Sequence, residues 1–195
     1  MRYAKIEEYE VSNGHLGGQS LYVQGCRFRC PNCFNPETWD FNGGKEWTPK
    51  VEDKFIELAS RPYIKRISLL GGECLADENL DGVLNLVNKI RLLMPEKTIW
   101  LYTGYEIKLS NLTYVDASDD YTIKKQYLFC TTQSSKNAVL NIKRQNILSS
   151  VDVVVDGRYI DSQRNITAKW KGSDNQRVID IKKSLREGRL TLWCE

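Results

Sequence analysis

The stretch from residue 23 to residue 39 reads VQGCRFRCPNCFNPETW, and it contains half of the six cysteines of the chain. These are Cys26, Cys30 and Cys33, separated by three residues and then by two. Three thiols on so short a loop lie close enough to one another to bind a single metal centre. The loop therefore predicts a metal site, and the rest of the sequence must say which kind.

Two kinds of centre fit three closely spaced thiols. A closed structural zinc site needs four ligands, and His15, the single histidine, or Cys74 is left to complete one. A four-iron cluster normally takes one thiolate per iron, so three thiolates leave one iron open to a substrate or cofactor. The spacing alone leaves zinc, an iron–sulfur cluster and three unligated thiols as alternatives.

A short apolar strand precedes this loop, and three similar strands follow along the chain. The expected strands cover residues 19–24, 65–70, 97–103 and 151–155, and they end in the loops CRFRCPNC, GGE, TGY and DGRY. Two helical patterns follow. Thr48 is expected to cap the first helix, with Pro49 at its first position, and Asp77 is expected to cap the second. Alternation of strands and helices predicts a mostly parallel α/β sheet, whose strand ends converge on one ligand site.

Length and composition indicate one globular domain over residues 1–195, and the region around residues 107–146, which shows no clear pattern, is expected to be an insertion. The chain has 28 Lys and Arg against 25 Asp and Glu, with no block of like charges, so no nucleic-acid partner is predicted. No apolar run exceeds four residues, which excludes a membrane span. The first ten residues, MRYAKIEEYE, lack an export signal, so a cytoplasmic location is expected.

The cysteine spacing is similar to that of radical S-adenosylmethionine (SAM) enzymes, and the stretch 23–39 resembles the activating proteins of anaerobic (class III) ribonucleotide reductases. Further segments resemble the same family; they are Ser12-Asn-Gly14, Leu70-Gly-Gly-Glu73, Leu101-Tyr-Thr-Gly-Tyr105, Val155-Asp-Gly157, Lys171-Gly-Ser-Asp-Asn-Gln-Arg177 and the tail 184–193. The resemblance covers both ends and the middle of the chain.

The resemblance implies an open, partial (β/α)6-type radical SAM barrel of about six strands. It also implies a [4Fe–4S] cluster on Cys26, Cys30 and Cys33, and SAM bound at the open iron. The expected SAM-binding residues are Asn32, Cys33, Phe34, Gly71, Gly72 and Glu73. Glycines permit close backbone approach, and either exposed peptide groups or the Glu73 carboxylate are expected to accept a hydrogen bond from the SAM amino group.

The implied activity is reductive cleavage of SAM, followed by hydrogen abstraction from a glycine of anaerobic ribonucleoside-triphosphate reductase. The cofactor supplies this chemistry, so no side chain is expected to act as a general acid or base. The implied partners are the reductase and a one-electron donor, either flavodoxin-like or thioredoxin-linked. An activase of a pyruvate formate-lyase-type enzyme and a non-catalytic metal-binding module remain the alternatives.

The sequence departs from the family pattern at four places. Asn32 stands where superfamily members often carry an aromatic residue, Phe28 replaces a frequent histidine, and Cys74 replaces a proline. The usual DGPF-like loop reads Asp156-Gly157-Arg158-Tyr159. None of these changes removes an expected cluster ligand.

The remaining candidate residues have simpler expectations. Cys130 and Cys194 lie among apolar neighbours and are expected to be core thiols. Cys74 adjoins the expected ligand site, where it is either a spare thiol or a packed core residue, and packing is the favoured interpretation. His15 is expected in a surface loop, and Arg27 and Arg29 either offset the charge of the cluster or are solvated.

Overall fold

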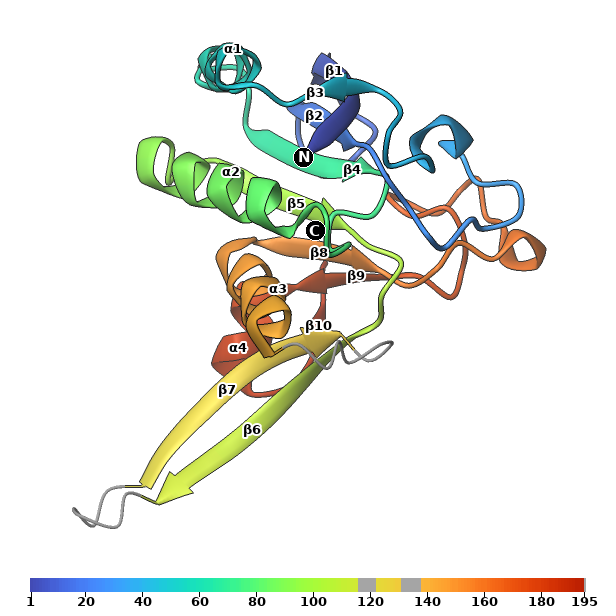
Figure 1. Ribbon diagram of the computed structural model, residues 1–195. Helices are drawn as coiled ribbons and strands as arrows, with labels where there is room; N and C mark the ends of the chain where they lie inside the picture. The colour runs from blue at the N-terminus through green and yellow to red at the C-terminus, as the bar shows by residue number, and fades with distance from the viewer. Residues whose placement is uncertain (116–121, 131–137, 195) are drawn as a thin grey trace.

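The computed structural model describes residues 1–115, 122–130 and 138–194. Its centre is an eight-stranded sheet with strand order β10-β9-β8-β5-β4-β2-β1-β3 (Figure 1). The strands are β1 (Arg2–Glu10), β2 (Gly18–Val23), β3 (Lys45–Glu46), β4 (Arg66–Gly71), β5 (Thr98–Tyr102), β8 (Val153–Asp156), β9 (Arg177–Asp180) and β10 (Thr191–Leu192). The helices are α1 (Pro49–Ala59), α2 (Leu80–Leu93), α3 (Ala138–Ser150) and α4 (Ile181–Glu187), with the 3₁₀ turns η1 (Pro36–Thr38) and η2 (Asp161–Gln163).

The four strands at the centre of the sheet are β2, β4, β5 and β8, and neighbouring members of this set are parallel. Helices α1, α2 and α3 lie in the three connections between them, as parallel pairing requires. These strands correspond to the four that the sequence predicts, with ends that differ by one or two residues. The predicted α/β class is confirmed.

Antiparallel strands complete the sheet at both edges. β1 pairs with β2 and β3 on one side, and β9 pairs with β8 and β10 on the other, all antiparallel. The sheet is therefore mixed and open, and its parallel part has four strands rather than the expected six. The reason is local, because β1–β2 and β8–β9 are joined by loops without a crossover helix, which makes each pair antiparallel.

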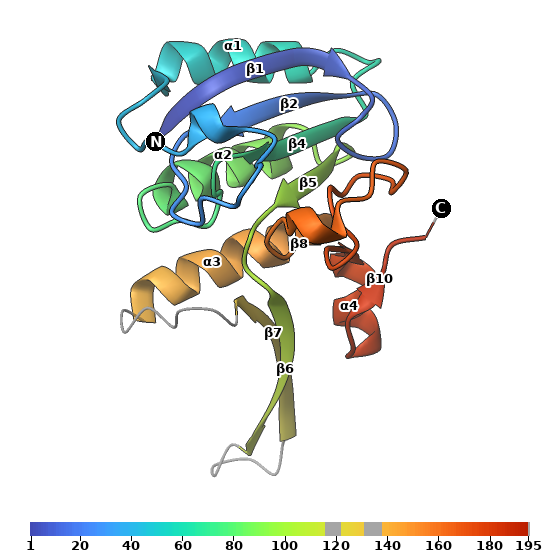
Figure 2. The same ribbon diagram turned by 90° about the vertical axis from the view of Figure 1, so that its right-hand side faces the viewer.

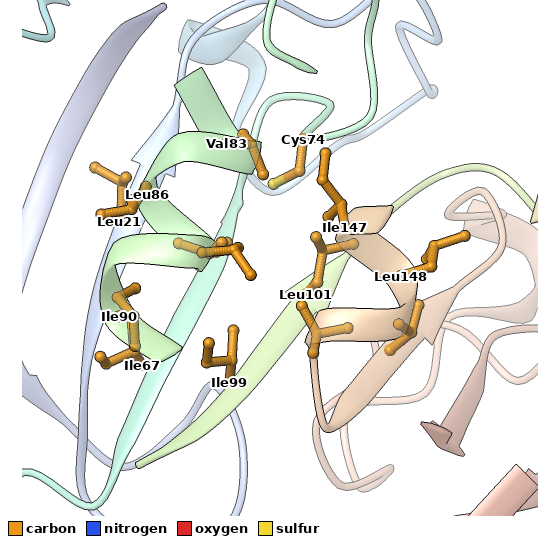
Figure 3. Close-up of a cluster of buried hydrophobic side chains, with 14 of the residues drawn as sticks. Leu21, Ile67, Cys74, Val83, Leu86, Ile90, Ile99, Leu101, Ile147 and Leu148 are labelled. Carbon is orange, nitrogen blue, oxygen red and sulfur yellow. The ribbon is translucent and has the colours of Figure 1, made fainter. Parts of the chain in front are cut away.

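The core lies between the sheet and its helices (Figure 3). A row of fully buried residues crosses the parallel strands in register, each paired with the next: Leu21, Leu69, Leu101 and Val154. Figure 3 shows side chains of α2 and α3, among them Leu86 and Ile147, packed on this side of the sheet. Side chains alternate across a strand, so the neighbouring residues point to the opposite face.

The starts of the two predicted helices differ in how well the sequence identifies them. Thr48 caps α1 by accepting a hydrogen bond from the Val51 N–H at 3.4 Å, with Pro49 in the first turn, as predicted. The prediction that Asp77 caps α2 is wrong. Asn79 is the residue before α2, and the Asp77 carboxylate accepts a hydrogen bond from Arg144 of α3 instead.

Part of the expected insertion around residues 107–146 forms the antiparallel hairpin β6 (Ile107–Val115) and β7 (Thr122–Cys130). The hairpin projects away from the body of the molecule in both views (Figures 1 and 2). Residues 116–121 and 131–137, which belong to the same expected insertion, lie outside the described residues. Among the helices of the described ranges, none is long and apolar enough to cross a membrane.

Candidate functional site

The three clustered cysteines lie on the loop after β2, and all three line one cavity of about 540 Å³. Their side chains are half-buried. The backbone of the loop is anchored at its start, where the Gly25 and Cys26 amides donate to the carbonyls of Thr38 and Trp39 at 2.7 and 3.0 Å. The start of the loop is thereby tied to the segment that follows it, while its three cysteines line the same cavity.

The glycine pair at the end of β4, Gly71 and Gly72, approaches the start of the cysteine loop closely. The Gly72 amide donates to the Val23 carbonyl and the Glu73 amide to the Gly25 carbonyl, both at 2.8 Å. A Cβ atom on Gly72 would lie 2.6 Å from the Gly25 oxygen, and Gly71 has a φ of +96°. Only glycine fits both positions without displacement. The GGE sequence therefore joins two strand-end loops in addition to lining the cavity.

Glu73 is fully buried and ties this loop to the next one. Its Oε1 accepts hydrogen bonds from the Leu75 amide at 2.8 Å and the Thr103 hydroxyl at 2.7 Å, and its Oε2 accepts one from the Gly104 amide at 2.8 Å. Burial raises the pKa of Glu73 to about 7, although these three hydrogen bonds oppose the rise. The carboxylate lines the cavity, yet most of its hydrogen-bonding capacity is used within the protein.

The loops after β5 and β8 complete the walls, so the four predicted strand-end loops line one cavity. All the predicted site residues except Asn32 line it. Asn32 is exposed, and its amide donates to Asp161 at 2.8 Å instead. The sequence analysis missed several lining residues, which are Asn13, Tyr22, Tyr102, Arg158, Tyr159, Trp170, Lys171 and Gln176. The segments 12–14 and 171–177, quoted for the resemblance, were the available signal for some of them.

A buried polar network holds the segment 12–14 against the sheet below the cavity. Arg66 is fully buried and donates to the Glu10 carboxylate and to the Asn13 carbonyl, both at 2.7 Å. Ser68 donates to the same Asn13 carbonyl at 2.7 Å, and the Asn13 amide donates to the Tyr22 hydroxyl at 3.1 Å. A buried ion pair with its remaining bonds satisfied fixes one geometry, because each missing partner would be costly.

The donor set fits an iron–sulfur cluster better than the zinc alternative. His15 packs against the rings of Trp170 and Trp193, and Cys74 is fully buried in the core, so neither residue is among those lining the cavity. Within the described ranges no three His, Cys, Asp or Glu side chains converge on a single metal ion. A four-iron cluster distributes its thiolates over separate irons, so it does not require such convergence.

The cavity also contains features suited to a polar organic ligand. The Tyr102 hydroxyl is buried without a hydrogen-bond partner in the described part of the chain, and Tyr102 lines the cavity. The hydroxyl oxygen itself is covered, so other atoms of Tyr102 form this part of the cavity wall. The glycine pair leaves backbone accessible on the same cavity.

The other cysteines are placed differently from one another. Cys74 is a core thiol, as predicted, and Cys130 packs partly buried against the same core. The prediction for Cys194 is wrong, because this residue is exposed after the edge strand β10. Its neighbour Trp193 instead packs on Trp100, and successive residues of an extended chain point in opposite directions.

The two arginines of the cysteine loop also differ. Arg27 pairs with Glu78 through a hydrogen bond of 2.7 Å and lies over the Phe41 ring at 4.5 Å. Arg29 is exposed, with a left-handed φ of 45°.

Burial raises the pKa of the Cys26 thiol to about 11, and the Glu73 carboxylate adds to this rise. Binding a metal would therefore release a proton from this thiol.

Comparisons with known proteins give the same assignment. Residues 13–179 match the family model described as a 4Fe-4S single cluster domain. The chain is 32% identical over 178 residues to the anaerobic ribonucleoside-triphosphate reductase-activating protein of Vibrio cholerae, covering 90% of this chain and 96% of that protein. The protein of the same name from Escherichia coli K12 is 31% identical over 93% of this chain and 100% of its own length. Its namesake from phage T4 is 30% identical, over 91% and 93%. The chain therefore belongs to the family of anaerobic ribonucleoside-triphosphate reductase-activating proteins, which carry a 4Fe–4S domain.

Proposed function

We propose that the chain is a radical SAM activase that installs a glycyl radical on anaerobic ribonucleoside-triphosphate reductase. The observation that carries this proposal is that three cysteines and a glycine pair line the same cavity. Three thiolates leave one position of a four-iron cluster open. The names of the relatives support the reductase, rather than a pyruvate formate-lyase-type enzyme, as the target.

In this proposal Cys26, Cys30 and Cys33 hold a [4Fe–4S] cluster. When bound, the cluster would supply one electron to SAM, releasing methionine and a 5′-deoxyadenosyl radical that takes a hydrogen atom from a glycine of the reductase. A flavodoxin-like or thioredoxin-linked protein would provide the electron. The protein would reside in the cytoplasm, where thiols stay reduced.

The side chains of this protein then bind and orient the reactants. Backbone groups of Gly71 and Gly72 would accept the SAM amino group, and Tyr102 would form part of the cavity wall. Glu73 would keep the glycine pair in place through Thr103 and Gly104. The walls of the cavity would exclude water from a reactive radical. No side chain is assigned as a general acid or base.

Anaerobic reconstitution tests the ligand set. We expect about four irons per chain, SAM cleavage only under reduction, and a glycyl radical signal on the reductase in electron paramagnetic resonance. Cys26→Ala, Cys30→Ala and Cys33→Ala should each lose iron, whereas Cys194→Ala, a change at the exposed cysteine, should not.

Three results would contradict the proposal. Full iron loading of Cys26→Ala would contradict the ligand assignment. Zinc without 5′-deoxyadenosine formation would favour a non-catalytic module. A glycyl radical on a lyase but not on the reductase would favour the other class of activase.

A further inference from the structure

The loop between β8 and β9, residues 157–176, packs along the cysteine loop although the two are more than a hundred residues apart in sequence. Figure 1 shows this orange loop beside the blue segment that follows β2, on the side of the sheet away from the helices. Arg158 donates to the Phe28 carbonyl at 2.7 Å and lies over the Phe28 ring at 4.9 Å. The cavity lies between these two loops, and residues of both line it.

A chain of hydrogen bonds joins the two loops through Asp161. The Asn32 side-chain amide donates to Asp161 Oδ2 at 2.8 Å, and the Tyr159 hydroxyl donates to Asp161 Oδ1 at 2.7 Å. The two donors occupy different oxygens of one carboxylate, so both bonds form together. These hydrogen bonds from Tyr159 and Asn32 lower the pKa of Asp161, which keeps it ionised at neutral pH. We call Asn32, Asp161 and Tyr159 the interloop bridge.

The bridge fixes a pair of aromatic rings on the cavity. Tyr159 lies 5.1 Å from Phe34, centroid to centroid, and both residues line the cavity. The Arg164 guanidinium lies 5.6 Å from the Phe34 ring centroid. Phe34 directly follows Cys33, and it remains 56% exposed, so much of its ring is available for contact with a ligand.

We propose that Phe34 and Tyr159 form the wall that contacts the nucleoside part of SAM, and that Asn32 and Asp161 are positioning residues that hold this wall in place. The inference rests on the proposed function, because it takes SAM as the ligand. Aromatic rings stack on nucleobases favourably, since every base has a π-face. Asn32 itself does not line the cavity, so the aromatic surface comes from the residue after Cys33 and from a distant loop.

Asn32 offers a clean variant for this test. Its φ of 55° lies in the left-handed region, which glycine adopts at little cost. Asn32→Gly therefore removes the amide of the bridge while keeping the backbone conformation of the cysteine loop. Asp161→Asn replaces one acceptor oxygen by an N–H₂ group. This group cannot accept a hydrogen bond, so either Asn32 or Tyr159 loses its acceptor. Gln163→Ala, in the same 3₁₀ turn and at an exposed residue, is the matched control.

The experiment measures SAM affinity by equilibrium dialysis on anaerobically reconstituted protein, with the iron content of each variant determined in parallel. We expect Asn32→Gly and Asp161→Asn each to raise the Kd for SAM about fivefold, at unchanged iron content, because each breaks a charge-assisted hydrogen bond. The Kd of the double variant for SAM should be no higher than that of the single variant with the higher Kd, because both changes break the same bridge. Gln163→Ala should bind as the wild type does.

A second measurement needs no SAM. Hydrogen exchange followed by mass spectrometry on metal-free protein should show faster exchange of residues 157–164 in both bridge variants, and unchanged exchange in Gln163→Ala. Unchanged exchange, unchanged SAM affinity or additive losses in the double variant would each overturn the proposal. A wild-type protein that holds iron but binds no SAM would instead overturn the proposed function, while the exchange data would still report on the bridge.

Discussion

Replacing Thr103 by valine tests whether the buried Glu73 carboxylate joins the glycine loop to the loop after β5. Valine has the shape of threonine without its hydroxyl, so the variant removes the 2.7 Å hydrogen bond to Glu73 Oε1 with little change in packing. It also removes the longer, 3.2 Å hydrogen bond that Thr103 Oγ1 accepts from the Tyr105 amide. Thr103 is only 5% exposed, so water does not readily replace the lost donor. The two remaining donors to Glu73 are the Leu75 and Gly104 amides.

The size of the effect depends on the charge of Glu73. A hydrogen bond to a charged group contributes about 2 kcal/mol, and one between neutral groups about 1 kcal/mol. The pKa of Glu73 is about 7, above its ordinary value of 4.5, so the folded protein retains a proton that the unfolded chain releases in this interval. The associated stability is present below pH 4.5 and is lost as the pH rises through 7.

We therefore expect Thr103→Val to lower the free energy of unfolding by about 2 kcal/mol at pH 8 and about 1 kcal/mol at pH 5.5. The larger loss at high pH arises because the variant raises the pKa of Glu73 further. Urea denaturation of reduced, metal-free protein, followed by tryptophan fluorescence at both pH values, measures the difference. Comparing each variant with the wild type at the same pH cancels the titration of other groups.

Thr98→Val is the control, because Thr98 begins the strand that Thr103 follows and its hydroxyl makes a long, exposed hydrogen bond of 3.3 Å to the Lys65 carbonyl. It should change stability by less than about 0.5 kcal/mol at both pH values. An equal loss for Thr103→Val at pH 5.5 and 8 would show that the ionised carboxylate is not its partner. No loss at pH 8 would refute the proposed tie between the loops.

Three further substitutions test packing, charge and backbone geometry. Ile147→Ala on α3 should cost about 2–5 kcal/mol in urea denaturation, whereas Ile142→Ala, at a residue 54% exposed on the same helix, should cost under about 1 kcal/mol. Glu10→Gln should reduce the loss of stability on acidification. Burial raises the pKa of Glu10, but the hydrogen bond from Ser20 and the charge and hydrogen bond of Arg66 outweigh burial and lower the pKa, so the contribution of Glu10 is present above pH 4.5 and is lost as the pH falls below that value. Gly25→Ala should reduce iron loading, since its Cβ would lie 2.2 Å from an aromatic ring. Gly157→Ala has a similar φ but open space, with no heavy atom closer than 3.6 Å, and should retain iron; equal loss in both variants would contradict the steric argument.

The central strands were predictable because each is a short apolar run that ends in glycine or in a glycine-containing loop. Strand β1 was not, because its sequence RYAKIEEYE carries five charged residues, of which Lys5 and Glu8 are exposed to water. Beyond Arg2 and Tyr3, which pair with β3, the outer side of β1 is an edge of the sheet. The same solvent exposure allows an edge strand to carry charges that a central strand excludes. The sequence signals therefore identified the parallel part of the sheet and missed the antiparallel strands on both sides.

The candidate site divides in the same way. The cysteine loop and the GGE loop are local patterns, so the sequence shows them directly. The contact between Asn32 and Asp161 joins residues 129 positions apart, and Phe34 pairs with Tyr159 across the same two loops. No periodicity reports such a contact, because only the folded sheet brings the ends of β2 and β8 to the same edge.

Strand β4 explains why one short sequence serves both the core and the cavity. Ile67 and Leu69 point to the helices and are fully buried in the main core. Arg66 and Ser68 point to the other face, where they hold the segment 12–14, and Leu70 lines the cavity on that face. Alternation along the strand thus places apolar packing on one face and polar positioning groups on the other. A substitution on the helix side should lower the free energy of unfolding, whereas one at Arg66 or Ser68 should in addition displace the segment 12–14, because their hydrogen bonds hold that segment.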